Sequence, residues 1–466
     1  MIQASAHVPE LITKELQIAR SGDRRKIRIS SNWLSIMGFE PGVRHETAPI
    51  APHAGLRLSF SATGRQKVYQ RRYKRRQNNP FETVIEIGAQ SVLDTAIPGY
   101  TERLHFTIRH GEILIRPLAN RTFSIRRNLR EEANPFAAAV AMTSGIDLRC
   151  LQDSGFTIDS VLEYRPQEAR DRYDLTETGA LNVLANAKPR LLINEDISRV
   201  DWDHVRDLMT GGPQVALMHI SLQCDDFTTA KGGNVRRQAV ADLTTSRDLV
   251  YDALRMVETI RPACVMLENV PGFAASGEGQ LFMLKLRKWG YHVSDGIFNA
   301  SEFGGLTRRE RYYLVGSVFP GFVMPKVSSP LRQPLWEQIR PFLPGCRDVT
   351  HTKSLQDGIE CGRARLITPN STIAPTVLKS QARQAKDSLY IEVEPGRFVL
   401  PSLDLLQFLN GIPTNIDLNS VNAEIATEII GQSIDYRMHE QITRALHEHI
   451  AANVGQHTTV KISNQR

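Results

Sequence analysis

The sequence predicts an α/β protein in which a parallel sheet flanked by helices follows a separate β-rich region at the N-terminus. Two observations support this prediction. Short apolar runs that alternate with helical periodicity begin near Ala137, a pattern typical of βαβ units. Before that point, short strand-like segments are separated by glycine turns. At roughly 100 to 200 residues per domain, the 466 residues correspond to two to four domains.

Composition and charge exclude several classes of protein. Five cysteines lie apart without a CxxC pair or a nearby histidine cluster, so neither a disulfide framework nor a zinc site is encoded. No run reaches the eighteen or so apolar residues of a membrane helix, and the first twenty residues lack a signal-peptide core. We therefore expect a cytoplasmic bacterial protein, associated with the nucleoid, without a metal and without a membrane partner.

The N-terminal region, residues 1–130, contains a hairpin pattern. Leu104–Arg109 and Glu112–Arg116 alternate in character around His110-Gly111. Together with Ile27–Ile29 and Trp33–Gly42, this segment resembles the swapped-hairpin DNA-binding modules of bacterial toxin and transition-state regulators. The resemblance implies a DNA-contacting module and a possible homodimer formed through it.

A run of basic residues without an acid interrupts this region. Its members are Arg65, Lys67, Arg71, Arg72, Lys74, Arg75 and Arg76. Tyr69 and Tyr73 are interleaved with them, and such a mixture suits a nucleic-acid phosphate backbone. The alternative is a solvated loop without a partner.

Each of four predicted strands in the second region is followed by a polar residue near its carboxyl end. These residues are Glu163, Asp196, Cys224 and Glu268. Because ligands of open α/β sheets bind outside the carboxyl ends of the strands, we expect the four side chains to converge on one crevice. The apolar face of Leu249–Ile260 predicts a crossover helix that Arg261-Pro262 ends.

The rest of the chain contains one further strand and a long irregular segment. Tyr312–Gly316 is the strand, and residues 319–397 show no strong helix, which predicts a small irregular domain or long loops. Helical patterns return in Ser402–Leu409, Ala423–Ile430 and Met438–Ala451.

Five motifs in a fixed order carry a family resemblance. They are Cys224 with Phe227 and Thr228, Glu268-Asn269-Val270, Arg309-Glu310-Arg311, Leu403…Phe408…Gly411-Ile412-Pro413, and Gly431-Gln432-Ser433. From about Ala137 to Ala451 the chain resembles the cytosine-5 DNA methyltransferases. The resemblance implies a Rossmann-like S-adenosylmethionine-dependent catalytic domain over residues 131–318, a target-recognition region over 319–397, and C-terminal helices over 398–466 that complete the catalytic domain.

The resemblance also implies a reaction on double-stranded DNA. The Cys224 thiolate would add to carbon 6 of a flipped cytosine, and carbon 5 would then take the methyl group. Glu268 would hold a proton at nitrogen 3 and Asn269 would order the loops around it. Arg309 would hydrogen-bond the cytosine O2, with Arg311 supporting the site.

For the methyl donor, the resemblance implies a second set of residues. Glu163 would accept from the ribose hydroxyls and Asp196 from the adenine amine, with Tyr164 and Ile197 packing on the ring. The other implied contacts are Ser144 and Gly145 in the first turn, Leu249 on the pocket wall, and Gln432 and Ser433 at its closure.

The sequence departs from the family pattern at several positions. The turn over residues 141–146 keeps one glycine where the family is glycine-rich, and Gln223, Thr307 and Gln432 replace the usual residues. Asp225 follows the nucleophile directly, and an acid there opposes thiolate formation. Two other functions therefore stay open: a catalytically silent DNA-binding regulator that keeps the fold, and a tRNA cytosine-5 methyltransferase.

Overall fold

The computed structural model describes residues 8–455 except 75–76, 78–79, 169–170, 229–232, 243 and 327–333. The chain divides into two compact units, Met1–Ser124 and Ile125–Arg466, with helix α3 (Arg121–Glu131) crossing the division. Arg75 and Arg76 of the basic run lie outside the described residues. Among the described residues, no helix is long and apolar enough to cross a membrane.

The N-terminal unit consists of two antiparallel sheets. The larger has the order β1 (Leu11–Gln17), β9 (Arg103–Arg109), β10 (Glu112–Pro117), β5 (Gly55–Phe60), β4 (Arg44–Ala51), β6 (Gln66–Lys67). The smaller has the order β2 (Ala19–Ser21), β3 (Arg24–Ser30), β8 (Phe81–Ile87), β7 (Tyr69–Arg72). Helices α1 (Trp33–Ile36) and α2 (Gln90–Ala96) complete the unit.

The predicted hairpin is confirmed, because β9 and β10 pair antiparallel around His110-Gly111. The resemblance to swapped-hairpin modules and the homodimer stay predictions.

The second unit is built on a seven-stranded sheet. Its order is β13 (Leu191–Ile193), β12 (Thr157–Leu162), β11 (Ala137–Ala141), β14 (Leu217–Ser221), β15 (Cys264–Asn269), β17 (Glu310–Ser317), β16 (His292–Asn299). The first five are parallel to their neighbours, whereas β17 is antiparallel to both β15 and β16. The α/β fold class is confirmed.

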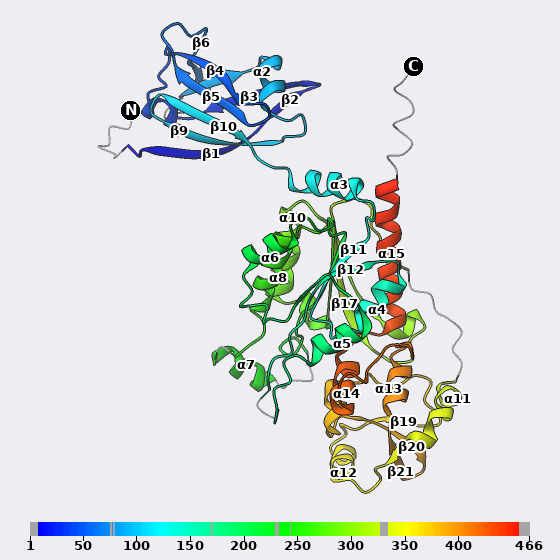
Figure 1. Ribbon diagram of the computed structural model, residues 1–466. Coiled ribbons are helices and arrows are strands. Elements are labelled where there is room, and N and C mark those ends of the chain that lie inside the picture. The colour runs from blue at the N-terminus through cyan, green and yellow to red at the C-terminus, as the bar shows by residue number, and fades with distance from the viewer. Residues whose placement is uncertain are drawn as a thin grey trace, which may run out of the picture. The chain divides into compact units, whose positions relative to one another are not determined.

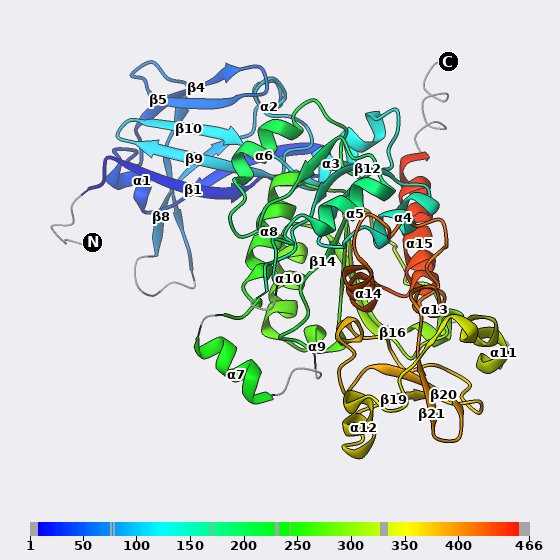
Figure 2. The same ribbon diagram turned by 60° about the horizontal axis from the view of Figure 1, so that its bottom comes forward.

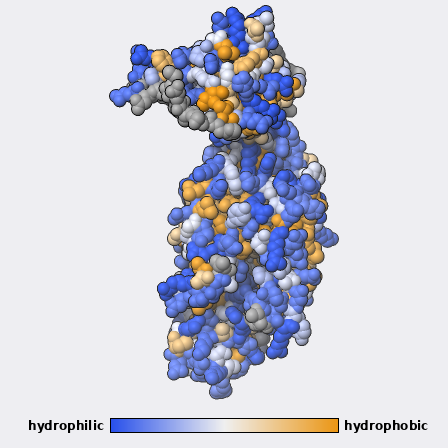
Figure 3. Space-filling model, turned by 90° about the vertical axis from the view of Figure 1, so that its left-hand side faces the viewer, coloured by the Kyte–Doolittle hydropathy of each residue, from blue (hydrophilic) through white to orange (hydrophobic). Residues whose placement is uncertain are grey.

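Helices cover both faces of this sheet (Figures 1 and 2). One face carries α4 (Ile146–Asp153), α5 (Thr178–Asn186) and α15 (Tyr436–Gly455), and the other carries α6 (Trp202–Met209), α8 (Leu249–Ile260) and α10 (Gly277–Lys288). The crossover helix α8 has the predicted bounds, and Arg261 ends it in the left-handed region (φ 53°). Hydrophilic residues cover most of the face with α6, α8 and α10, where apolar side chains form small groups (Figure 3).

Two short helices follow the strands that carry the site: α7 (Gly233–Ala241) lies beyond β14 and α9 (Pro271–Ala274) beyond β15. A 3-10 turn, η1 (Ala300–Phe303), links β16 to β17. The C-terminal helices are α13 (Leu403–Leu409), α14 (Ala423–Gln432) and α15, close to the three predicted segments.

The segment expected to be irregular is more ordered than the sequence indicates. Strands β18 (Arg347–Asp348), β21 (Arg397–Leu400), β20 (Leu389–Glu394) and β19 (Arg365–Ile367) form a sheet in that order. The helical segments beside it are α11 (Leu335–Ile339), η2 (Arg340–Gly345), α12 (Lys353–Glu360) and η3 (Lys379–Arg383). Strands this short are below the length at which alternation is detectable.

The topology creates one natural crevice. From β11, the chain continues to β12 on one side, whereas β14 lies on the other side. Such a switch point separates the loops at the carboxyl ends of the strands and leaves room for a ligand. Those loops contain Ser144, Glu163, Asp196 and Cys224.

Candidate active site

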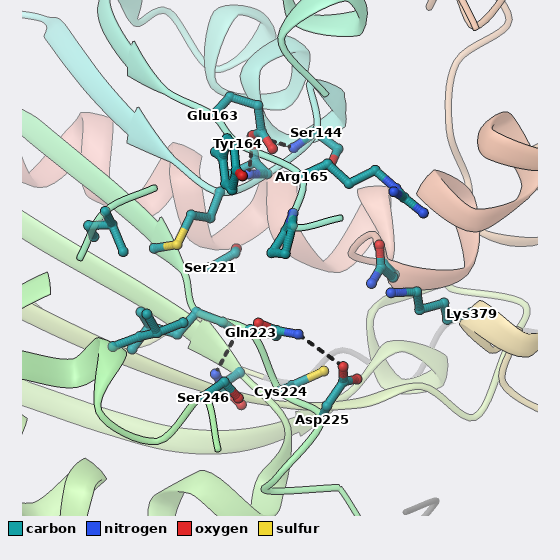
Figure 4. A pocket seen from close by; sticks show the side chains of 18 of the residues that line it. Ser144, Glu163, Tyr164, Arg165, Ser221, Gln223, Cys224, Asp225, Ser246 and Lys379 are labelled. Carbon is teal, nitrogen blue, oxygen red and sulfur yellow. Dashed lines mark hydrogen bonds between the residues drawn. The ribbon is translucent and has the colours of Figure 1, made fainter. Parts of the chain in front are cut away.

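A cavity of about 550 Å³ opens at the carboxyl ends of these strands. It is lined by every residue predicted for the site except Gly145 and Arg309. Figure 4 shows Ser144, Glu163 and Tyr164 on one side of the cavity and Cys224 with Asp225 on the other. The structure thus brings the two predicted halves, donor site and nucleophile, into one space.

The first turn keeps an unusual backbone although it has one glycine. Met142 and Ser144 adopt positive φ angles of 61° and 52°, and Gly145 follows at 97°. A side chain in this region costs about 1 kcal/mol or more, so the surroundings must hold the turn. A Cβ on Gly145 would lie 2.9 Å from Nδ2 of Asn182, which donates to the Ser144 carbonyl at 2.6 Å. Gly145 therefore shapes the turn from outside the cavity.

Glu163 anchors the same turn. Its Oε2 accepts from the backbone N–H groups of Thr143 (2.9 Å) and Ser144 (2.8 Å). The carboxyl group is buried, and burial raises its pKa to about 7 in spite of these two hydrogen bonds. Its charge therefore changes near neutral pH.

The remaining residues predicted for the donor site line the cavity from four segments. Asp196 turns the chain after β13, since its Oδ1 accepts from the N–H and hydroxyl of Ser198 at 3.0 and 2.8 Å. Ile197 is buried beside it, and Leu249 begins α8. Tyr164, Gln432 and Ser433 also line the cavity.

Cys224 lies in the tight loop that follows β14. The N–H groups of Phe227 and Thr228 both donate to the Cys224 carbonyl, at 2.9 and 3.0 Å. Asn269 donates from Nδ2 to the Leu222 carbonyl at 3.0 Å, which joins this loop to the end of β15. Gly272 allows the same approach, because a Cβ there would lie 2.2 Å from the Phe227 carbonyl oxygen.

Opposing effects act on the Cys224 thiol. Burial raises its pKa above the ordinary value, and the carboxylates of Asp225 and Glu268 act in the same direction. The Arg311 guanidinium lowers it. Gln223 donates to Asp225 at 3.1 Å (Figure 4). Asp225, which the sequence analysis expects to oppose thiolate formation, therefore also opposes it in the structure.

The two arginines of the Arg-Glu-Arg motif have different surroundings. Arg311 lines the cavity and its Nε lies 2.7 Å from Glu268 Oε1. Arg309 is fully buried and donates to the carbonyls of three residues, Val377 (3.0 Å), Gly431 (3.3 Å) and Ser433. The Arg309 guanidinium therefore does not line the cavity, and its expected contact with the cytosine O2 stays a prediction. Arg309 joins three segments of the chain through these hydrogen bonds.

Several residues of the site escaped the sequence analysis. Asp226 accepts through Oδ2 from Thr245 Oγ1 and Ser246 N, both at 2.8 Å, and so joins the nucleophile loop to the start of α8. In the sequence, this role of Asp226 is indicated by its position as the second of two acids directly after Cys224. At another edge of the cavity Glu428 lies 3.4 Å from Arg165 and 3.5 Å from Lys379. No local pattern connects these three positions.

The central part of the chain is similar to known proteins. Residues 194–331 match the model of the C-5 cytosine-specific DNA methylases. The type II methyltransferase M.Bsp6I of Bacillus sp. (strain RFL6) is 28% identical over 187 residues, 39% of this chain and 51% of that protein. DNA (cytosine-5)-methyltransferase 1B of Oryza sativa subsp. japonica is 30% identical over 129 residues, 27% of this chain and 8% of that protein. The chain thus spans about half the length of the first relative.

Two solved structures share the fold. The S. pombe Dnmt2 methyltransferase aligns with a TM-score of 0.50 at 15% identity, over 67% of this chain and 98% of that one. The Entamoeba histolytica methyltransferase EhMeth aligns with a TM-score of 0.52 at 13% identity, with the same coverage. At these identities the likeness concerns the fold alone. Residues 194–331, which include Cys224, Glu268 and Arg309, are thus similar to the C-5 cytosine-specific DNA methylases.

Proposed function

We propose that this protein transfers a methyl group from S-adenosylmethionine to carbon 5 of cytosine in double-stranded DNA. The observation that carries the proposal is a single cavity lined by the Cys224 thiol, the Glu268–Arg311 ion pair and the donor-site residues around Glu163. A thiol nucleophile, an acid and a guanidinium are the groups that covalent activation of a cytosine requires.

On the base side, the Cys224 thiolate forms a bond to carbon 6 and pushes electron density to carbon 5. Glu268 holds a proton at nitrogen 3, which neutralises the ring as the adduct forms. Arg311, in place of Arg309, donates to the cytosine O2 and keeps Glu268 oriented through their ion pair. S-adenosylmethionine would supply the methyl group to carbon 5 and leave as S-adenosylhomocysteine. Loss of the carbon 5 proton to water would then expel the thiolate, and return of the nitrogen 3 proton to Glu268 would restore the cytosine ring.

On the donor side, S-adenosylmethionine supplies an activated methyl group. Oε2 of Glu163 bonds the first turn, and its other oxygen, Oε1, accepts from the ribose hydroxyls. Asp196 accepts from the adenine amine. Tyr164 and Ile197 pack against the adenine ring, while Leu249, Gln432 and Ser433 close the cavity around the rest of the donor.

Donor binding should depend on pH through Glu163. With a pKa of about 7, this group gains its charge between pH 6 and 8, so affinity for S-adenosylmethionine should rise across that range. Isothermal titration calorimetry at pH 6.0, 7.0 and 8.0 measures it. The Glu163→Gln variant should bind more weakly at pH 8 and show a flat profile.

The same substitution should raise stability at alkaline pH. Folded Glu163 keeps a proton up to about pH 7 that the unfolded chain releases near the ordinary value of 4.5. The unfolded state therefore binds fewer protons in this window, and stability falls as pH rises through it, by on the order of 3 kcal/mol. Urea unfolding at pH 5 and pH 8 should show a smaller loss for Glu163→Gln. An unchanged pH dependence would contradict the assignment.

Removing the acid beside the nucleophile should increase the rate. Because Asp225 raises the Cys224 pKa, Asp225→Asn should increase the thiolate fraction at neutral pH and give a few-fold higher kcat/KM. The acidic limb of the pH–rate profile should move to lower pH. Asp248→Asn, an acid of the same cavity, serves as control and should leave the limb in place. An unmoved limb in Asp225→Asn would show that this carboxylate does not act on the thiol.

We also propose that the N-terminal unit contacts DNA through the described part of the basic run. Arg71 and Arg72 are exposed on β7, where they lie over the rings of Tyr73 (5.2 Å) and Phe81 (5.9 Å). Each phosphate contact contributes about 0.9 to the slope of log affinity against log salt. The double variant Arg71→Ser/Arg72→Ser should therefore bind DNA more weakly and with a slope smaller by roughly 1.8.

A matched control is available in the other sheet of that unit. Arg57 and Arg103 pair with Glu112 and Glu15, so Arg57→Ser/Arg103→Ser removes the same charge from paired positions. The control should keep the salt slope. Equal salt slopes for the wild type and Arg71→Ser/Arg72→Ser would show that these arginines are solvated and do not contact DNA.

Transfer of tritiated methyl groups tests the proposed activity directly. Purified protein should label unmethylated genomic DNA and leave total tRNA unlabelled, and digestion should release the label as 5-methylcytosine. DNA in which 5-fluorocytosine replaces cytosine should trap a complex that survives denaturant, because fluorine cannot leave carbon 5 as a proton does. Labelled tRNA with unlabelled DNA would favour the RNA enzyme, and no label on either would favour the silent regulator.

A further inference from the structure

A buried polar cluster lies beneath the cavity and takes no part in the proposed methyl transfer. Asp147 is at the start of α4, His219 on β14 and His439 near the start of α15. The three residues are 2%, 0% and 0% exposed. One ligand atom from each lies within 4.8 Å of the others.

The polar atoms of this cluster lack partners. Oδ1 of Asp147, both ring nitrogens of His219 and Nε2 of His439 accept and donate no hydrogen bond. Asp147 Oδ2 and His219 Nδ1 are 3.7 Å apart, which is too long for a hydrogen bond. Leaving a buried polar group unsatisfied costs about 1 to 3 kcal/mol, so four unsatisfied atoms on three neighbouring residues call for a common explanation.

The surroundings orient these atoms as a metal site would. The Tyr313 hydroxyl lies 3.0 Å from Nδ1 of His439 and leaves Nε2 of that ring free for the cluster. Ser221 donates to Oδ2 of Asp147 at 3.3 Å. Outer hydrogen bonds of this kind hold ligating histidines and carboxylates in place.

We propose that Asp147, His219 and His439 bind a divalent transition-metal ion of the Zn²⁺ class. Two imidazoles and one carboxylate suit such an ion. Ligands about 2.1 Å from a tetrahedral ion lie about 3.4 Å apart, so a contraction of the cluster from its present spacing of up to 4.8 Å completes the site. Asp147 and Ser221 also line the cavity, which gives the ion an entry path and water as its fourth ligand.

The ion would fasten distant parts of the chain to one another. His439 belongs to α15, the last helix, whereas Asp147 belongs to α4 and His219 to the central strand β14. Cysteine spacing cannot indicate this site, because none of its ligands is a cysteine and they are 72 and 220 residues apart in the sequence (219 − 147 and 439 − 219).

Metal analysis of the full-length protein tests the proposal. After loading with Zn²⁺ and desalting, the wild type should retain about one equivalent by mass spectrometry of the metal, and its apparent Tm should fall when a chelator removes it. Co²⁺ should give visible absorption typical of nitrogen and oxygen ligands, without a thiolate charge-transfer band. Absence of stoichiometric metal in the wild type, or a thiolate band, would overturn the proposal.

Variants locate the ion. His219→Leu/His439→Leu should lose the retained metal and the response to chelator, while His447→Leu on the same helix should keep both. His439→Gln is a milder second variant and should weaken retention by itself. Retention of one equivalent by the double variant would overturn the assignment.

Discussion

Replacing Cys224 with alanine should abolish methyl transfer while leaving the binding of S-adenosylmethionine and DNA largely intact. The substitution removes the only atom proposed to bond to carbon 6, so the loss should be on the order of 10⁴-fold or more. The side chain is small and half-buried, and the loop is held by the Cys224 carbonyl and by Asn269 rather than by the sulfur. Tritium transfer, calorimetry and gel mobility measure the three properties.

Cys264 provides the matched control for this experiment. It is fully buried in β15, where burial raises its pKa to about 12, and it lies outside the cavity lining. Cys264→Ala should lower stability slightly by leaving a small cavity and keep transfer near the wild-type rate. If Cys224→Ala retained transfer and Cys264→Ala lost it, Cys264 and not Cys224 would be the nucleophile.

Substitution of the two motif arginines should give opposite results. Arg311→Ala should reduce kcat by roughly 10²-fold or more, because it removes a donor to the developing charge, while the domain stays folded. Arg309→Met should instead destabilise the domain by about 3 to 5 kcal/mol, since the three buried carbonyls at Val377, Gly431 and Ser433 lose their donor. Urea unfolding and single-turnover transfer separate the two effects.

A conservative pair of substitutions strengthens this comparison. Arg309→Lys keeps a donor for one of the carbonyls and should recover part of the stability. Arg311→Lys keeps the charge beside Glu268 and should recover part of the rate. If Arg309→Met is as stable as the wild type but inactive, Arg309 and not Arg311 contacts the base.

Periodicity predicts the catalytic sheet well and the smaller sheets poorly. The strand over β15 and the helix α8 are long enough, and apolar enough on one face, to be recognised locally. Strand β16 was missed because Gly296, Ser294 and Asp295 interrupt its alternation, and only pairing with β17 along its whole length defines it. The strands β18, β19 and β21 cannot be recognised locally because they are only 2, 3 and 4 residues long.

The sequence predicts the site residues that follow the end of a strand. It does not predict the residues whose place in the structure depends on contacts between distant segments. Glu163 and Cys224 stand at positions that the topology forces together, so their convergence follows from the sequence. Arg309 precedes β17 and Arg311 is the second residue of that strand, and nothing local indicates which of them faces the cavity. Asp147, His219 and His439 meet only because three elements pack together in the core.

Bisulfite sequencing tests the central claim most directly. DNA is taken from a host without cytosine methylation that expresses either the wild-type protein or Cys224→Ala, with both shown to be present in comparable amounts. The account predicts protected cytosines within one short sequence context for the wild type and none for the variant. Complete conversion of every cytosine in both samples, or equal protection in both, would contradict it.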